Sequence, residues 1–259
     1  MAFAGQVAVV TGSDRGIGRE IAEAFCREGA HVVLVSWDRE MLSATEASFA
    51  GRGYRIAAVH ADLTKEEDVR RVVESALRMT GRIDILVNNA GIAGPTKPVQ
   101  DIEVEEWRQV IECNLTSMFL CCKYVVPYMV NQRFGRIVNI SSMSGKRPLP
   151  YRVPYTASKM GVIGLTRTLA AELGPYGITV NAICPGSVHG DRIEHVIREQ
   201  ARVRGLPIEA VRDEFLSVSP LRRMVDPKEI ASMVLYLAGP AGESITGEDV
   251  NVTAGVVMY

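Results

Sequence analysis

The chain has 259 residues, 47% of them hydrophobic, and a formal net charge of −1 at pH 7. This length suits one large α/β domain or two small ones, and the apolar content can supply a sizeable core. The near-zero charge argues against a nucleic-acid partner, because such a partner requires a basic surface.

Targeting and redox signals are absent from the printed sequence. The first residues lack a basic region followed by an apolar signal segment, and we find no run near the roughly 20 apolar residues that span a bilayer. The five cysteines lie in apolar segments, are odd in number and form no Cys-x-x-Cys pair. We therefore expect buried reduced thiols, no metal site, no membrane partner and a cytoplasmic location.

Short apolar runs alternate with longer amphipathic ones. Buried strands are predicted at residues 7–10, 32–35, 56–59, 85–87, 136–140 and 179–183. Helices are predicted at residues 16–28, about 103–131 and about 154–173, with a further helix after Thr64, whose spacing from Glu67 is that of a capping box. The alternation predicts a single α/β domain over residues 1–259, a doubly wound Rossmann-type parallel sheet with helices on both faces.

Residues 187–220 break this rhythm, because they contain two helical pieces and many charges but no strand. An insertion of this length beside the carboxyl end of a strand is typical of a lid over a substrate site.

A glycine-rich turn joins the first strand to the first helix. Its sequence over residues 11–18 is TGSDRGIG, with glycines at Gly12, Gly16 and Gly18. Glycine permits a tight turn and a close approach to a pyrophosphate, and the helix N-terminus offers free amides to that anion. The first gap between glycines is one residue longer than in the usual dinucleotide fingerprint.

Tyr155 and Lys159 are spaced to share one face of a helix, thirteen and seventeen residues after Ser142. A tyrosine with its ordinary pKa near 10 is a poor base at neutral pH, and lowering that pKa by about 3 units takes roughly 4 kcal/mol. A cation roughly 4 Å away supplies energy of that order at an effective dielectric constant of about 20. The pair therefore suggests a tyrosine activated by a lysine.

Several motifs occur in a fixed order along the chain. They are Thr11-Gly12-x-x-x-Gly16-Ile17-Gly18, Asp62-Leu63, Asn88-Asn89-Ala90-Gly91, Asn114, Ser142, Tyr155, Lys159 and Pro185-Gly186. This ordered set resembles the classical short-chain dehydrogenase/reductase family over nearly the whole chain.

The resemblance implies a role for each catalytic position. Tyr155 would be the acid/base on the substrate oxygen, and Lys159 would lower the Tyr155 pKa and bind the nicotinamide ribose. Ser142 would orient the substrate oxygen, because the thirteen-residue gap to Tyr155 selects it over Ser141. Asn114 would hold a proton-relay water, although it could instead only satisfy buried backbone groups.

The resemblance also implies a cofactor site. The positions expected to contact the nucleotide are Gly12, Arg15, Gly16, Ile17, Gly18, Asp38, Asp62, Leu63, Asn89, Tyr155, Lys159 and Val188. Asp62 would accept from the adenine amino group, or could instead cap the following turn. The threonine that often follows Pro-Gly by a few residues is replaced by Gly190, which leaves its phosphate contact to other groups.

The choice between NAD and NADP depends on the end of the second strand. NAD-specific relatives usually have an acid where this chain has Ser36, and NADP-specific ones often have an arginine where it has Trp37. Asp38 could bind the ribose hydroxyls and repel a 2′-phosphate, whereas Arg15 is placed to attract one. These two side chains could also pair with each other. We favour NAD over NADP.

Cations near the catalytic pair suggest the substrate. Arg147 and Arg152 lie in the proline-rich loop between Ser142 and Tyr155, and Arg192 shares a predicted lid-helix face with His195 and Arg198. Arginine binds carboxylate, sulfonate or phosphate groups through its planar fork. The alternative is that the lid cations pair with Asp191, Glu194 and Glu199 on a solvated helix.

The sequence thus predicts an NAD(P)-dependent oxidoreductase that interconverts a secondary alcohol or sugar-type hydroxyl and a carbonyl on an anionic or polyhydroxylated small molecule. Alternatives are a 3-oxoacyl-thioester reductase, a relative acting on nucleotide sugars, or a non-catalytic nucleotide-binding regulator. Apolar residues on the two long helices, together with the family's helix pairing across two-fold axes, predict a homotetramer. These residues are Phe119, Val125, Val126, Met160 and Leu165.

Overall fold

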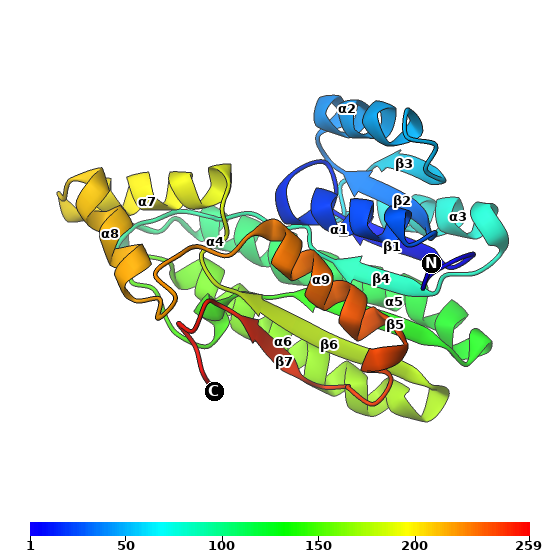
Figure 1. Cartoon of the computed structure of the whole chain (residues 1–259). Coiled ribbons are helices and arrows are strands. Elements are labelled where there is room, and N and C mark those ends of the chain that lie inside the picture. The colour runs from blue at the N-terminus through cyan, green and yellow to red at the C-terminus, as the bar shows by residue number, and fades with distance from the viewer.

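One seven-stranded parallel sheet forms the centre of the molecule, in a computed structural model that describes every residue from Met1 to Tyr259 (Figure 1). The strand order is β3-β2-β1-β4-β5-β6-β7. The strands are β1 (Val7–Thr11), β2 (His31–Ser36), β3 (Ile56–His60), β4 (Ile85–Asn88), β5 (Gly135–Ile140), β6 (Ile178–Pro185) and β7 (Asp249–Val252). This is the doubly wound topology, whose strand order reverses between β1 and β4.

Helices cover both faces of the sheet (Figure 1). They are α1 (Gly16–Arg27), α2 (Arg39–Ala50), α3 (Glu66–Thr80), α4 (Val104–Ile111), α5 (Ser117–Gln132), α6 (Val153–Leu173), α7 (Asp191–Arg204), α8 (Ile208–Ser217) and α9 (Pro227–Ala238). Helices α7 and α8 extend beyond the sheet, beside the segment that joins β5 to α6 (Figure 1). The predicted insertion is therefore helical and projects from the body of the domain.

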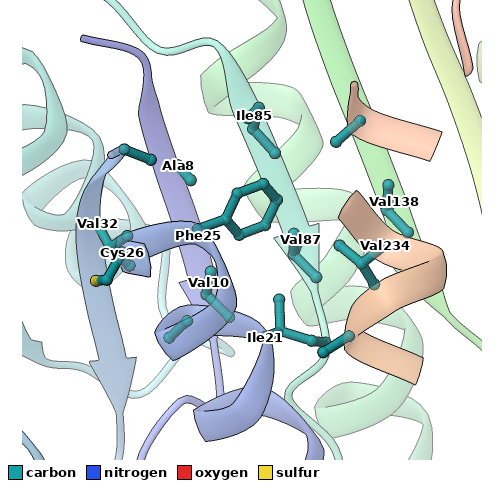
Figure 2. Close-up of a cluster of buried hydrophobic side chains, with 14 of the residues drawn as sticks. Ala8, Val10, Ile21, Phe25, Cys26, Val32, Ile85, Val87, Val138 and Val234 are labelled. Atoms are coloured by element: carbon teal, nitrogen blue, oxygen red, sulfur yellow. The ribbon is translucent and has the colours of Figure 1, made fainter. Parts of the chain in front are cut away.

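Two buried apolar clusters flank the sheet. One contains residues of α1, α2 and α9, and the other contains residues of α3, α5 and α6. Figure 2 shows the first cluster, where Ile21 and Phe25 of α1 and Val234 of α9 meet Val10 and Val87 of the central strands. Alternate strand residues point to opposite faces, so strands buried on both sides must be apolar throughout. This burial makes the central sheet a rigid support for the loops at its edge.

The six predicted strands are confirmed, but β7, α2 and α9 were not predicted. Strand β7 has only four residues, Asp249 to Val252, all partly buried at the sheet edge, so it lacks the continuous apolar run of a central strand. The predicted helix over 103–131 is interrupted by a π-helical turn, Glu112–Thr116, between α4 and α5.

The predicted capping box at Thr64 is wrong. Helix α3 begins at Glu66, and its N-cap residue Lys65 makes no side-chain cap. The Thr64 hydroxyl instead donates to Asp62 Oδ1 at 2.7 Å. This short-range bond holds the hydroxyl outside the helix, because threonine competes for local polar partners before a helix starts.

The joined helical segment Val104–Gln132 is long and apolar enough to cross a membrane by length and composition alone, a property our sequence reading missed. Its α5 part contributes Leu120, Cys121, Cys122, Val125 and Met129 to the second buried cluster. The apolar character of this segment is thus explained by its packing against the sheet.

The carboxyl ends of the parallel strands meet at one edge of the sheet, which is where ligands bind in open α/β sheets. The glycine-rich turn follows β1, Asn89 to Gly91 follow β4, Ser142 follows β5, and Val188 follows β6. The fold therefore brings the predicted site segments to a single edge.

Candidate active site

The turn after β1 is built for close backbone packing. Gly12 and Gly16 have positive φ angles of 63° and 54°, which favour glycine. A Cβ at Gly18 would collide with the carbonyl of Gly12 and the side-chain amide of Asn89. The turn therefore excludes a side chain at Gly18 by close packing and favours glycine at Gly12 and Gly16 by backbone conformation.

Asn89 and Thr11 lock this turn to the end of β4. The Asn89 side-chain nitrogen donates to the carbonyls of Thr11 and Gly12 at 2.9 and 3.0 Å. The Thr11 hydroxyl accepts from the backbone amides of Asn89 and Ala90 at 2.9 and 3.0 Å. In this structure Asn89 shapes the nucleotide turn, and its amide donors are already engaged.

A pyrophosphate fits the start of helix α1. The N-cap residue Arg15 makes no side-chain cap, and the first turn contains no acidic residue. The backbone amides beginning at Gly16 and Ile17 consequently lack a side-chain acceptor, and the helix dipole favours an anion there. Together with the glycine packing, these features match the phosphate end of a dinucleotide.

Arg15 and Asp38 form the ion pair that the sequence left open. Arg15 Nη2 lies 2.7 Å from Asp38 Oδ2, and Arg15 Nε lies 2.8 Å from Asp14 Oδ2. The other Asp38 oxygen, Oδ1, caps helix α2 by accepting from the Met41 amide at 3.1 Å. Trp37, directly before Asp38, is 71% exposed. The two residues expected to distinguish NAD from NADP are therefore coupled.

The remaining predicted nucleotide contacts lie at the same edge. Asp62 caps the next turn by accepting from the Thr64 amide at 3.1 Å, as the alternative interpretation stated, and its side chain is 46% exposed. Leu63 is buried, and Val188 forms an isolated bridge with Val225. Asp62 thus has a structural partner and an exposed face that remains available to an adenine.

Tyr155 and Lys159 lie one helical turn apart in α6, and Lys159 Nζ is 5.8 Å from the centre of the Tyr155 ring. Burial alone would raise the pKa of Tyr155, but Lys159, Arg192, the Ser142 hydroxyl and Arg152 together outweigh it. The pKa of Tyr155 consequently lies below its ordinary value. Burial also lowers the pKa of Lys159, and the phenol opposes that effect.

Ser142 and Lys159 are both fixed by the backbone. The Ser142 hydroxyl accepts from the Ser144 amide at 3.1 Å, at the start of a short 3₁₀ turn. Lys159 Nζ donates to the Ile140 carbonyl at 2.8 Å, and an ammonium has two further donors. Both groups therefore keep hydrogen-bonding capacity toward the site.

Asn114 occupies the π-helical turn and is fully buried. Its oxygen accepts from the Ile92 amide at 2.7 Å, and its nitrogen donates to the Ile92 carbonyl and the Ser158 hydroxyl, each at 3.1 Å. It thus satisfies buried backbone groups, as one of our two interpretations required. Such π turns recur at functional sites, because they redirect side chains inside a helix.

Two arginines crowd the phenol without an acidic partner. The Arg152 guanidinium is buried, lies 4.8 Å from the centre of the Tyr155 ring and donates to the Ala93 carbonyl at 2.7 Å. Its Nε is buried with no hydrogen-bond partner. Arg192, at the start of α7, donates to the Gly91 carbonyl at 2.6 Å. All the charges found to perturb the pKa of Tyr155 are cations.

Two of the three lid acids, Glu194 and Glu199, form ion pairs with residues other than the three cations considered from the sequence. Glu194 binds Arg212 through two contacts of 2.7 and 2.6 Å, which ties α7 to α8. Glu199 pairs with Arg202 at 2.7 Å. The alternative in which Arg192 pairs with a lid acid is therefore wrong, and this guanidinium binds the Gly91 carbonyl at the catalytic edge instead.

An ion-pair cluster behind the catalytic residues was missed. Lys146 Nζ lies 3.0 Å from Asp249 Oδ2, with side chains 10% and 12% exposed, and Arg167 of α6 contacts the same carboxylate at 3.0 Å. Asp249 thus joins the loop after Ser142 to the helix that carries Tyr155. No local signal could reveal this cluster, because Lys146 and Asp249 are 103 residues apart.

The chain is similar to known dehydrogenases and reductases in both sequence and structure. The family model for short chain dehydrogenases matches residues 6–201. The 3-oxoacyl-[acyl-carrier-protein] reductase of Synechocystis sp. is 38% identical, over 100% of this chain and 99% of that protein.

Two solved structures share the fold closely. An NAD⁺-bound xylitol dehydrogenase has a TM-score of 0.95 at 35% identity, covering 98% of this chain and 100% of that one. A variant actinorhodin polyketide ketoreductase with NADPH has a TM-score of 0.94 at 36% identity, covering 98% of each chain. These similar folds hold different nicotinamide cofactors.

Proposed function

Because the chain belongs to the short-chain dehydrogenase family and is an oxidoreductase of the CH–OH/carbonyl class, we propose that it oxidises a secondary alcohol or sugar-type hydroxyl reversibly on an anionic or polyhydroxylated substrate. The observation that carries the anionic part is the set of cations at Tyr155: Arg152 lies 4.8 Å and Lys159 5.8 Å from the centre of its ring, and neither Arg152 nor Arg192 has an acidic partner. Such a site is stabilised by negative charge.

The catalytic step uses the Tyr155 oxygen as base. In the oxidative direction the tyrosinate takes the hydroxyl proton, while the Ser142 hydroxyl orients the same substrate oxygen. Lys159 stabilises the tyrosinate, and Arg152 and Arg192 add positive charge beside it. A bound nicotinamide supplies the acceptor or donor of a hydride. The protein's own contribution is therefore positioning and charge stabilisation.

The nucleotide would lie along the glycine turn and the α1 N-terminus, with Asp62 at its adenine end and Lys159 at its nicotinamide ribose. We favour NAD, because the Asp38 carboxylate would repel a 2′-phosphate and holds Arg15 in an ion pair. The relatives with NAD⁺ and with NADPH make both cofactors chemically reasonable on this fold.

A second candidate is reduction of 3-oxoacyl thioesters. It is supported by the similarity to a 3-oxoacyl-[acyl-carrier-protein] reductase over the full length of both proteins. It uses the same Ser142, Tyr155 and Lys159 chemistry in the reductive direction. For either candidate we expect a soluble, cytoplasmic enzyme.

A substrate screen tests the proposal. Polyols, sugars, hydroxy acids, hydroxy sulfonates and 3-oxoacyl thioesters are each supplied with NAD(H) and NADP(H), and the reduced nicotinamide absorbance is followed. Turnover that favours acidic or polyhydroxylated compounds supports the first candidate, and turnover confined to thioesters supports the second. Nucleotide binding without turnover of any compound would instead indicate a non-catalytic regulator.

A further inference from the structure

A cavity of about 380 Å³ lies between the loop after Ser142 and the two lid helices. This volume falls within the roughly 300–1,000 Å³ of small-molecule sites. Its walls include Met143 and Leu149 from the loop, Phe215 of α8, and Val218, which directly follows α8. None of the four predicted catalytic residues lines it, yet it begins at Met143, directly after Ser142.

The wall between this cavity and the domain is firmly held. Gln200 of α7 is 1% exposed and donates to the Pro150 carbonyl at 2.9 Å, which fastens the lid helix to the loop. Arg204 and Glu214 face each other across the two lid helices through contacts of 2.7 and 2.9 Å. The charges of this pair are mutually satisfied, so the pair supplies little binding energy to a ligand.

Arg147 is the one charged residue lining the cavity that has no ion-pair partner. It lines the cavity, its side chain is exposed, and its guanidinium makes no ion pair or side-chain hydrogen bond. Arg152 and Arg192, by contrast, are already bound to the Ala93 and Gly91 carbonyls beside the phenol. Arg147 is thus an unpaired cation in the lining of a pocket that also has apolar walls and that none of the predicted catalytic residues lines.

We propose that this cavity binds the distal part of an elongated substrate, with an apolar segment against Met143, Leu149 and Val218 and an anionic end group on Arg147. The inference rests on the proposed oxidoreductase function and narrows its substrate class to amphiphilic acids longer than a simple hydroxy acid. The end group is a carboxylate or a phosphate, since either matches the arginine fork.

The experiment uses a length series of acids with a secondary hydroxyl at the penultimate carbon, each paired with its neutral methyl ester. The preference of the intact, NAD⁺-saturated enzyme is the ratio of kcat/KM for acid over ester. We expect this ratio to rise with chain length once the acid reaches Arg147, to on the order of 10-fold for a partly solvated charge-assisted contact. Arg147→Ala should return the ratio to about 1 for the long acids alone.

Matched variants distinguish the loss of a charge in the cavity from a general effect of substitution on folding. Arg198→Ala removes an exposed lid arginine that does not line the cavity, and it should leave the ratio unchanged. Val218 is 42% exposed, so Val218→Glu and Val218→Gln introduce similar shapes that differ in charge. Val218→Glu should weaken binding of long acids relative to Val218→Gln, while both should treat the esters alike.

Binding is measured in parallel by calorimetry, with the longest acid as probe in the presence of NADH. A length-dependent preference that disappears in Arg147→Ala supports the inference. If the enzyme oxidises short alcohols or hydroxy acids but shows no such preference, the inference is wrong and the proposed function stands. If the long acid binds through Arg147 but nothing is oxidised, the cavity assignment stands and the proposed function is wrong.

Discussion

At the scale of single residues, the proposed function depends on charged side chains around Tyr155 and Asp38. The sequence predicts which of them are close together only where they are close along the chain. The spacing of Ser142, Tyr155 and Lys159 predicted their proximity, because short segments fix it. The position of Arg152 against the Tyr155 ring was not predictable, since it follows from the contact between Arg152 and Ala93, 59 residues away. The Arg15–Asp38 contact remained one of two alternatives for the same reason.

Replacing Asp38 tests the cofactor preference. Asp38→Asn keeps an oxygen that can cap α2 but removes the carboxylate and frees Arg15. We expect the NADP/NAD ratio of kcat/KM to rise roughly 10-fold, equivalent to about 1.4 kcal/mol. Steady-state kinetics with both cofactors measures the ratio.

Asp38→Ala serves as the comparison, because it should shift the ratio similarly but also lose about 1 kcal/mol of stability with the helix cap. An unchanged ratio in both variants would show that Asp38 does not face the nucleotide.

At the scale of elements, apolar runs predicted the central strands because those strands are buried on both faces. The same reasoning missed β7, which lies at the sheet edge and alternates Asp249 and Asn251 with valines. It also missed the π turn that carries Asn114, for which no sequence signal is evident. An edge strand such as β7 is defined by its pairing with a distant strand, and a π turn is a small local change within a helix. Neither changes the local pattern of apolar residues enough to be predicted from it.

Asp249 of β7 should position the catalytic loop relative to α6. In Asp249→Asn, Lys146 and Arg167 lose their shared carboxylate, which is largely buried. We expect the free energy of unfolding to fall by about 2 kcal/mol. We also expect kcat to fall more than the affinity for NAD, because Ser142 and Tyr155 lose their common anchor while the glycine turn is untouched.

Chemical denaturation and nucleotide titration measure these two effects. Arg108→Gln, in an exposed ion pair with Glu105, should cost less than about 1 kcal/mol and leave kcat unchanged. Equal effects of the two substitutions on kcat would refute a positioning role for Asp249.

At the scale of the whole molecule, helices α5 and α6 leave an apolar surface exposed. Phe119 is 49% exposed, Tyr128 39% and Met160 53%. Of the residues expected there, Val125 is buried in its own subunit's core and cannot contribute, while Val126 and Leu165 are partly buried. A contiguous apolar face on these helices would favour self-association.

We expect sedimentation to show a homotetramer of about 113 kDa, four chains of 28.3 kDa each. Phe119→Glu should dissociate it into smaller species, because a carboxylate would be buried between subunits. Leu206→Glu, at an exposed position on the lid, should leave the assembly intact. A wild-type protein that sediments as a monomer at micromolar concentration would contradict the prediction.

The central claim is that Tyr155 acts as a base with a lowered pKa, and the pH dependence of alcohol oxidation tests it most directly. The base must be deprotonated, so kcat/KM should rise with pH through an apparent pKa below the ordinary tyrosine value near 10, which belongs to the coupled Tyr155–Lys159 pair. Tyr155→Phe should abolish this limb and reduce turnover at least about 10²-fold while still binding nucleotide. A limb near 10, or a Tyr155→Phe enzyme that retains its activity, would contradict the account.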